Sequence, residues 1–277
     1  MPSAFLPDRA FVRISGADAE HFLQNLITTD LTALAENELR PGALLTPQGK
    51  ILFDFLISRD GDGFQIDMRA DQREAFVKRM AMYKLRAAVT IDVLAETGAT
   101  VGWGEETTAA VDHRFALAGT TVSRQPGKIG EAFDSAGYDA LRVLHGVPES
   151  GADYALQDAF PHDVLFDKSG GVSFRKGCYV GQEVVSRMQH RSTARRRVVI
   201  VSAETPLPAS GTDITTNGKS IGTLGTVAGE RGLAILRIDK AGEAMTSGAP
   251  IFAGDVPVTV ALPGWSGLDF PSVAEEA

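Results

Sequence analysis

The chain has 277 residues, of which 44% are apolar and 22% are charged, and its formal net charge at pH 7 is −8. This composition is that of an ordinary globular protein with one large domain or two to three small ones. The acidic balance argues against general affinity for nucleic acid, which needs an excess of Lys and Arg. The single cysteine excludes an intramolecular disulfide and a self-contained cysteine-rich zinc or iron–sulfur site.

The sequence contains no signal that would place the chain in a membrane. No run of about 18 apolar residues is present, which is the length that a membrane-spanning helix needs. The first residues, MPSAFLPDRAFVRI, lack the basic region and apolar stretch of a secretory signal. We therefore expect a cytoplasmic protein with no membrane partner and no nucleic-acid partner.

The first half of the chain predicts a mixture of strands and amphipathic helices. Apolar residues at helical spacing indicate the helices, and apolar runs bounded by turn residues indicate strands and hairpins. The expected helices cover residues 18–27, 70–88 and 137–144. The expected strands cover residues 9–14, both arms of a hairpin over 43–57, and 64–68, 89–94 and 115–122. Residues 96–110, rich in Gly, Thr and Glu, are expected to form a loop or a domain crossing.

The character of the sequence changes at about residue 195. Short β-rich runs alternate with Gly, Pro, Asn and Asp turns such as Asn217-Gly218, which predicts a small antiparallel barrel. The runs cover residues 198–202, 214–216, 220–226, 233–238, 251 and 256–261. The last residues, SGLDFPSVAEEA, are expected to be loose.

The segment FRKGCYVGQEVVSRMQHR, residues 174–191, holds the single cysteine, Cys178. Apolar residues after Gly181 predict a helix, so Cys178 is expected in a glycine-shaped turn before a helix N-terminus. The helix dipole and the neighbouring Arg175 and Lys176 would favour the thiolate. The alternative is that Cys178 is a small, buried and inert apolar residue.

Three further features bear on the site. Asp54 interrupts an apolar strand, so it either lies near solvent at a strand end or faces a pocket. The histidines lack metal-ligand spacing, and no metal site is expected. A basic run is either a solvated linker or a site for an anion, such as the glutamate tail of a ligand or an acidic partner. The run consists of Arg187, His190, Arg191, Arg195, Arg196 and Arg197.

The motif K-G-C-Y-V-G-Q-E around Cys178 resembles the signature of the YgfZ family, folate-binding relatives of the glycine cleavage T-protein. The segments ISGADAEHFLQNLITTDL, TPQGKILFDFLI and LRVLHGVPESGADY are similar to other parts of that superfamily. The resemblance therefore extends over nearly the whole chain. It implies an α+β fold with three domains in a ring, closed by a C-terminal antiparallel β-barrel.

The resemblance also implies domain boundaries. A discontinuous folate-binding domain is expected over residues 1–43 and 117–194, with the cysteine motif in its second part. A second domain is expected as an insertion over residues 44–116, the barrel over 195–264, and a flexible tail over 265–277.

The function that the resemblance implies is assembly, maintenance or repair of iron–sulfur clusters in client enzymes, with tetrahydrofolate as the ligand. Cys178 and Lys176 would carry the activity, and Cys178 is a candidate transient ligand of iron or of a cluster. One cysteine supplies one ligand, so a cluster would be shared with a client enzyme or an A-type carrier protein. The implied folate-binding residues are Gln24, Asn25, Asp54, Arg142, Tyr179, Gln182, Glu183 and Arg187.

Two departures from the aminomethyltransferases concern their folate site. Those enzymes have an Asp-Asp pair where this chain has Phe53-Asp54, and a Glu where it has Leu144. These changes argue against aminomethyl transfer, because a transferase must hold the pterin and position its methylene donor. Two alternatives stay open: a folate-dependent one-carbon transferase or demethylase that uses Asp54, and a plain folate-binding protein in which Cys178 is structural.

Overall fold

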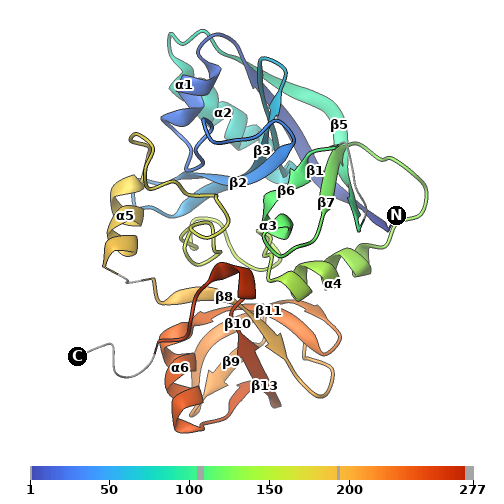
Figure 1. Ribbon diagram of the computed structural model, residues 1–277, viewed down its shortest axis with the longest axis vertical. Coiled ribbons are helices and arrows are strands. Elements are labelled where there is room, and N and C mark those ends of the chain that lie inside the picture. Colours follow the sequence, from blue (N-terminus) through green and yellow to red (C-terminus); the bar gives the residue numbers. More distant parts are fainter. Residues whose placement is uncertain (1, 105–108, 192–193, 272–277) are drawn as a thin grey trace. The chain divides into compact units, whose positions relative to one another are not determined.

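The computed structural model describes residues 2–104, 109–191 and 194–271. The chain divides into two compact units, and each is built around a closed β-barrel. The first unit combines Met1–Ser135 with Phe166–Val184, and the second combines Ala136–Leu165 with Val185–Ala277 (Figure 1). The cysteine motif therefore belongs to the same unit as the N-terminal strands, although more than a hundred residues separate them in sequence.

The barrel of the first unit has the strand order β1-β4-β3-β2-β6-β7-β5 and closes by pairing β1 with β5. Its pairings are antiparallel except for β2 with β6. The strands are β1 (Ser3–Ser15), β2 (Glu38–Leu45), β3 (Ile51–Asp60), β4 (Gly63–Arg69), β5 (Thr90–Trp103), β6 (Val111–Asp112) and β7 (Val122–Pro126). The helices are α1 (Ala19–Gln24), the 3-10 turn η1 (Ala70–Gln72), α2 (Arg73–Lys84) and α3 (His113–Ala116).

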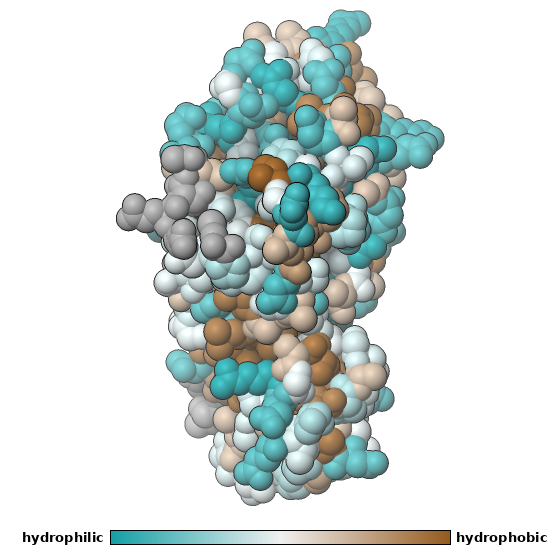
Figure 2. Space-filling view, turned by 90° about the vertical axis from the view of Figure 1, so that its right-hand side faces the viewer, coloured by the Kyte–Doolittle hydropathy of each residue, from teal (hydrophilic) through white to brown (hydrophobic). Residues whose placement is uncertain are grey.

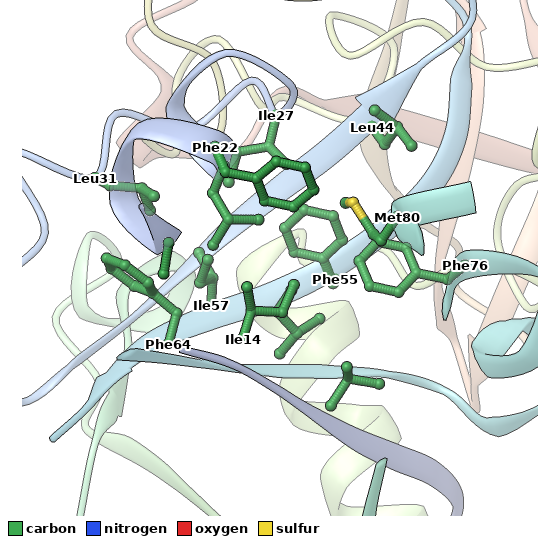
Figure 3. Packing of buried hydrophobic residues seen from close by; sticks show 14 of the residues in the cluster. Ile14, Phe22, Ile27, Leu31, Leu44, Phe55, Ile57, Phe64, Phe76 and Met80 are labelled. Carbon is green, nitrogen blue, oxygen red and sulfur yellow. The ribbon is translucent and has the colours of Figure 1, made fainter. Parts of the chain in front are cut away.

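The main core of the first unit lies between one face of this sheet and helices α1 and α2. Apolar residues alternate along the strands, so that every second side chain points to this face. Figure 3 shows Phe55 and Ile57 of β3 beside Phe22 of α1 and Phe76 of α2. The ring centroids of Phe55 and Phe76 are 5.8 Å apart.

The opposite face of the same sheet carries buried charges. Asp67 of β4 accepts hydrogen bonds from Arg9 Nε at 2.7 Å and from Arg124 Nε at 2.8 Å. Burial acts to raise the pKa of Asp67, but the two guanidinium groups outweigh it and lower that pKa. The strand register pairs Asp67 with Phe11 and with Leu56. Asp54, two residues before Leu56 on β3, therefore lies on this charged face.

The second unit contains the six-stranded antiparallel barrel that the C-terminal sequence predicted, with the order β10-β11-β8-β13-β12-β9. Its strands are β8 (Arg196–Ser202), β9 (Asp213–Thr216), β10 (Lys219–Ala228), β11 (Arg231–Arg237), β12 (Ile251–Ala253) and β13 (Val256–Ala261). Its further elements are α4 (Ser135–His145), which begins one residue before the unit, α6 (Ile238–Ser247) and the 3-10 turn η2 (Gly264–Ser266).

Two sequence-based expectations about the elements are wrong, and one helix was not expected. Residues 96–103 are not a loop but the second half of β5, whose Thr and Gly residues pair with β1 and β7. The strand expected over 115–122 is replaced by α3 and a turn, because Asp112 accepts a hydrogen bond from the Arg114 amide as a helix cap. Helix α6 was missed, although Gly248 ends it with φ 71°.

Two other expectations concern the C-terminal tail and the absence of a membrane-spanning helix. Residues 105–108 and 272–277 lie outside the described residues, and the second of these segments is the end of the tail expected over 265–277. At the start of that tail, Trp265 Nε1 donates a hydrogen bond to the His145 carbonyl at 2.7 Å. Within the described part of the chain, no helix has the length and hydropathy that crossing a membrane requires. The surface in Figure 2 shows separate hydrophobic patches among hydrophilic side chains.

Candidate functional site around Cys178

Cys178 is exposed to solvent on a loop that precedes helix α5 (Gln182–His190). The expected helix after Gly181 is confirmed, and Cys178 lies four residues before its first residue. The alternative in which Cys178 is a buried apolar residue is wrong, because the thiol belongs to an exposed residue. The thiol is therefore accessible to a partner molecule, as a reactive or ligating cysteine must be.

The loop that carries Cys178 is fixed to the segment after helix α1. Thr28 Oγ1 donates to the Gly171 carbonyl at 2.6 Å, and the Ser173 amide donates to the Thr28 carbonyl at 2.9 Å. Lys176 Nζ donates to the carbonyls of Ile27 at 2.9 Å and Thr29 at 2.7 Å. These bonds join residues about 150 apart in sequence. They hold the segment from Gly171 to Lys176, which leads into the cysteine.

Lys176 is half-buried, and its surroundings alter its protonation. Burial lowers the pKa of Lys176 to about 8, against the attraction of the nearby Asp30 carboxylate. Asp30 is in turn held by Gln24, whose Nε2 donates to Asp30 Oδ1 at 2.8 Å. Sequence reasoning missed Asp30 as part of the site, although it lies just after the helix expected over residues 18–27. Lys176 therefore anchors the cysteine loop, and its part in the activity stays a prediction.

Tyr179 follows the cysteine and points inward. Its side chain is buried, and Lys176 Nζ lies 5.5 Å from the centre of its ring. Burial raises the pKa of Tyr179 to about 12. Its hydroxyl is buried without a hydrogen-bond partner among the described residues. A buried hydroxyl of this kind calls for a partner such as a ligand or water.

Gly181 ends the loop in a conformation that few other residues adopt. Its φ is +79°, and a Cβ at this position would lie 2.5 Å from the Thr46 carbonyl oxygen. The glycine thus permits α5 to start close against the turn between β2 and β3. The same turn leads into β3 and Asp54, so the cysteine loop and the Asp54 strand share a neighbour.

Asp54 is half-buried in the middle of β3, where the sequence left a strand end and a pocket as alternatives. It pairs in register with Ala43 of β2, and the Ala43 amide donates to Thr28 Oγ1 at 3.0 Å. Thr28 is the residue that binds the cysteine loop. The pKa of Arg69 is raised chiefly by the hydrogen bond that Arg69 donates to Asp71, and the negative charge of Asp54 adds to this effect.

The other residues expected to bind folate are distributed over both units. Besides its bond to Asp30, Gln24 accepts a hydrogen bond from the Leu31 amide, and Asn25 is exposed and donates to the His21 carbonyl. Gln182 is half-buried and Glu183 exposed at the start of α5, and Arg187 is exposed further along that helix.

Arg142 lies in the second unit and is almost fully buried. It donates to Asp153 at 2.7 Å, to Asp139 at 2.8 Å and to Thr226 Oγ1 at 2.9 Å. Burial acts to lower the pKa of Arg142, but Glu149, Asp153 and Asp139 outweigh it and raise that pKa. These contacts give Arg142 a structural role, and its part in folate binding stays a prediction.

A surface cavity in each unit is lined by residues other than those expected in the site. One of about 350 Å³ is lined in the first unit by Glu20, Arg59, Asp62 and Phe64, with Gly16, Ala17, Gly61 and Gly63. Another of about 580 Å³ is lined in the second unit by Ser202–Thr205 and Pro257–Thr259. Neither is lined by Cys178 or by another residue that the sequence assigned to the site.

Comparison with solved structures supports the expected fold. The chain superposes on the crystal structure of glycine cleavage system aminomethyltransferase T from Bartonella henselae with a TM-score of 0.68, over 96% of this chain and 86% of that one. Sequence identity is 15%, so the likeness concerns the fold alone. Residues 195–268 match the family model described as the CAF17 C-terminal beta-barrel domain.

Curated relatives cover most of the chain. The mouse iron–sulfur cluster assembly factor IBA57 is 31% identical over 84% of this chain and 76% of its own length. The human protein of the same name is 30% identical over 85% of this chain and 77% of its own length. An IBA57 homolog from Pyricularia oryzae is 29% identical over 90% of this chain and 75% of its own length. These names differ from the YgfZ family that the motif resembles, and they point to a related family with the same fold.

The expected cytoplasmic location is overturned by the same relatives, which are named as mitochondrial proteins. The sequence test sought an apolar secretory signal, whereas mitochondrial targeting uses amphipathic, Arg-rich segments that such a test does not detect. Because relatives at 30% and 31% identity are covered over three quarters of their length, this chain belongs to the IBA57 family.

Proposed function

We propose that this chain assists the assembly or maintenance of iron–sulfur clusters and that Cys178 is the group that contacts the cluster, its iron or its sulfur. The observation that carries the proposal is the exposed thiol on a loop whose backbone is anchored by Lys176 and Thr28. The names of the mouse and human relatives, both iron–sulfur cluster assembly factors, support it. The motif around Cys178, which resembles that of the YgfZ family, agrees with it.

The cluster or its parts would be cargo shared with another protein. Thiolate sulfur is a soft ligand suited to iron–sulfur clusters and to iron. Since the chain has one cysteine, it supplies one thiolate, and a client enzyme or an A-type carrier would supply the remaining ligands. The exposed position of Cys178 permits such a shared arrangement.

Reduced folate is the ligand that we propose for the interior of the first unit. The buried Tyr179 hydroxyl, which lacks a hydrogen-bond partner among the described residues, fits a polar ligand group. Asp54, on the charged face of β3, would bind the pterin together with Tyr179. A reduced folate supplies one-carbon chemistry when bound. The chain's own contribution would be to hold the pterin and to keep the cysteine loop in place.

The experiment that tests the proposal compares wild type with Cys178→Ala in cells that lack the protein. We expect wild type to restore the activity of [4Fe–4S] enzymes and the variant to fail at matched expression. Because Cys178 is exposed, the variant should keep its unfolding free energy within about 0.5 kcal/mol of wild type. Equal rescue by a folded variant would refute the role of the thiol.

The transferase alternative is separated by a second variant. It predicts that Asp54→Asn abolishes activity while Cys178→Ala does not, whereas the cluster proposal predicts the opposite order of severity. Titration of the purified chain with tetrahydrofolate, followed by calorimetry, tests the ligand independently of cluster activity. Asp54→Asn should weaken this binding and Cys178→Ala should leave it unchanged.

A further inference from the structure

The outer face of helix α2 carries an uncommon concentration of positive charge. Residues 73–86 contain five basic side chains and one acidic one, in a chain whose net charge is −8. Lys78, Arg79 and Arg86 are exposed, and so are Met82 and Leu85, with exposed fractions of 61% and 87%. Positions 78, 79 and 82 fall on one side of α2, and Leu85 and Arg86 directly follow its last residue, Lys84. We call these five residues the α2 surface.

Within the part of the chain that the structure describes, the cations of the α2 surface have no acidic partner. Among the described residues, no carboxylate forms an ion pair or hydrogen bond with Lys78, Arg79 or Arg86. Other arginines of the same unit are paired: Arg13 lies 2.9 Å from Asp60, and Arg40 lies 2.7 Å from Glu38. Among its described residues, the first unit thus pairs several cations with carboxylates and leaves Lys78, Arg79 and Arg86 exposed to solvent.

A solvated helix face is the simplest explanation of such charges, and it accounts for part of them. Cations near a helix C-terminus are stabilised by the helix dipole, which suits Lys84 and Arg86. The helix dipole does not account for Lys78 and Arg79, which lie in the middle of α2. Nor does it account for two large apolar side chains, Met82 and Leu85, among the charges. Exposed Met with surrounding Arg is the composition that protein interfaces favour.

From this geometry we propose that the α2 surface docks an acidic protein partner, with Met82 and Leu85 at the apolar centre of the contact and Lys78, Arg79 and Arg86 at its charged rim. Charge complementarity selects an acidic surface, and the apolar centre selects a protein over a nucleic acid. An anionic membrane fits less well. A membrane-surface helix presents its whole apolar face to lipid, whereas Phe76 and Met80 of α2 are fully buried in the core.

This inference goes beyond the proposed function and does not depend on it. A partner held at α2 would be recognised by residues outside the cysteine motif, and binding there would be independent of the thiol. The surface is therefore expected to bind its partner equally well in wild type and in Cys178→Ala, which separates a failure of this inference from a failure of the proposed cluster chemistry.

The test uses a photoreactive residue in the full-length chain, Met82→p-benzoylphenylalanine, expressed in cells and irradiated. The crosslinked peptide is then sequenced by mass spectrometry. We expect crosslinks to a second protein at a segment rich in Asp and Glu. Adding Lys78→Glu and Arg79→Glu should reduce the crosslink yield about tenfold or more, because like charges then face each other.

A matched control distinguishes the α2 surface from overall charge. Lys219→Glu with Arg231→Glu makes the same change in net charge at two exposed positions of the second unit, and it should leave the crosslink yield unchanged. Replacing the acidic residues of the crosslinked segment by Lys should restore the yield with the Lys78→Glu and Arg79→Glu variant.

Other results would overturn the proposal. These are the absence of a crosslinked protein, crosslinks to a second copy of this chain, crosslinks to a segment without acidic residues, and equal loss in both double variants. Flotation with vesicles containing phosphatidylglycerol gives one more outcome: binding that Lys78→Glu and Arg79→Glu abolish would assign the surface to a membrane.

Discussion

At the scale of single residues, the protonation of Lys176 and the exposure of Cys178 define the site. Lys176 stabilises the cysteine loop through two backbone carbonyls, yet burial disfavours its charged form and lowers its pKa to about 8. A neutral amine still donates hydrogen bonds, so the anchor survives deprotonation. The charge of Lys176, in contrast, changes close to physiological pH.

The lowered pKa of Lys176 predicts how stability depends on pH. Between about pH 8 and the ordinary lysine value of 10.5, the unfolded chain binds more protons at Lys176 than the folded chain. The unfolding free energy therefore rises with pH in this window because of Lys176. Urea unfolding at pH 7.5 and pH 9.5 should show wild type gaining stability relative to Lys176→Met. Lys78 is exposed, so the difference in unfolding free energy between wild type and Lys78→Met should be the same at both pH values. A stability advantage of wild type over Lys176→Met that falls from pH 7.5 to pH 9.5 would contradict the prediction.

At the scale of elements, the position of α5 depends on the backbone at Gly181. The helix begins one residue after a glycine with φ +79°, pressed against the Thr46 carbonyl of the β2–β3 turn. The motif contains a second glycine, Gly177, whose surroundings are more open than those of Gly181. A Cβ there would meet no atom within 4 Å. The two glycines of one sequence motif therefore serve different purposes.

We predict opposite outcomes for alanine at these glycines. Gly181→Ala should lower the unfolding free energy by about 1–3 kcal/mol, from the positive φ and the contact with Thr46. Gly177→Ala should change it by about 0.5 kcal/mol at most, since its Cβ would enter open space. Thermal and denaturant unfolding of both variants provide the measurement. Equal destabilisation would show that the start of α5 is not limited by Gly181.

At the scale of the whole molecule, each unit joins segments distant in sequence through a buried ion network. In the first unit, Asp67 connects Arg9 of β1 with Arg124 of β7. In the second, Arg142 of α4 connects Asp153 with Thr226 of β10, and the Thr226 amide donates to Asp153 at 2.7 Å. Residues 136–165 are thus attached to the C-terminal barrel by polar contacts.

Removal of Arg142 tests this attachment. Arg142→Met should destabilise the second unit by about 3–5 kcal/mol, because Asp153 would be left buried with no countercharge. Asp139 is 48% exposed, and Asp139→Asn should cost about 1 kcal/mol at most. Trp265, in the second unit, reports the transition by fluorescence once Trp103→Phe removes the other tryptophan. Similar effects of the two changes would contradict a buried network centred on Arg142.

The sequence by itself determined the features that rest on local patterns. The hairpin of β2 and β3, helix α5 and the C-terminal barrel follow from apolar periodicity and turn residues, which act over a few neighbours. The motif around Cys178 located the candidate site, because its glycines, charges and cysteine are contiguous. Local patterns gave wrong predictions for the second half of β5 and for α3. There the structure was decided by strand pairing and by a helix cap.

Only the tertiary structure decided which distant groups meet. Lys176 reaches Ile27 and Thr29 from about 150 residues away, and Arg142 is bound to Asp153 and Thr226. Lys78, Arg79 and Arg86, in contrast, have no carboxylate partner among the residues that the structure describes. The exposure of Cys178 was also decided by the tertiary structure, because it depends on how the cysteine loop packs against the segment after α1. Such contacts arise from chain topology, and a linear pattern contains no record of them because their partners are far apart along the chain.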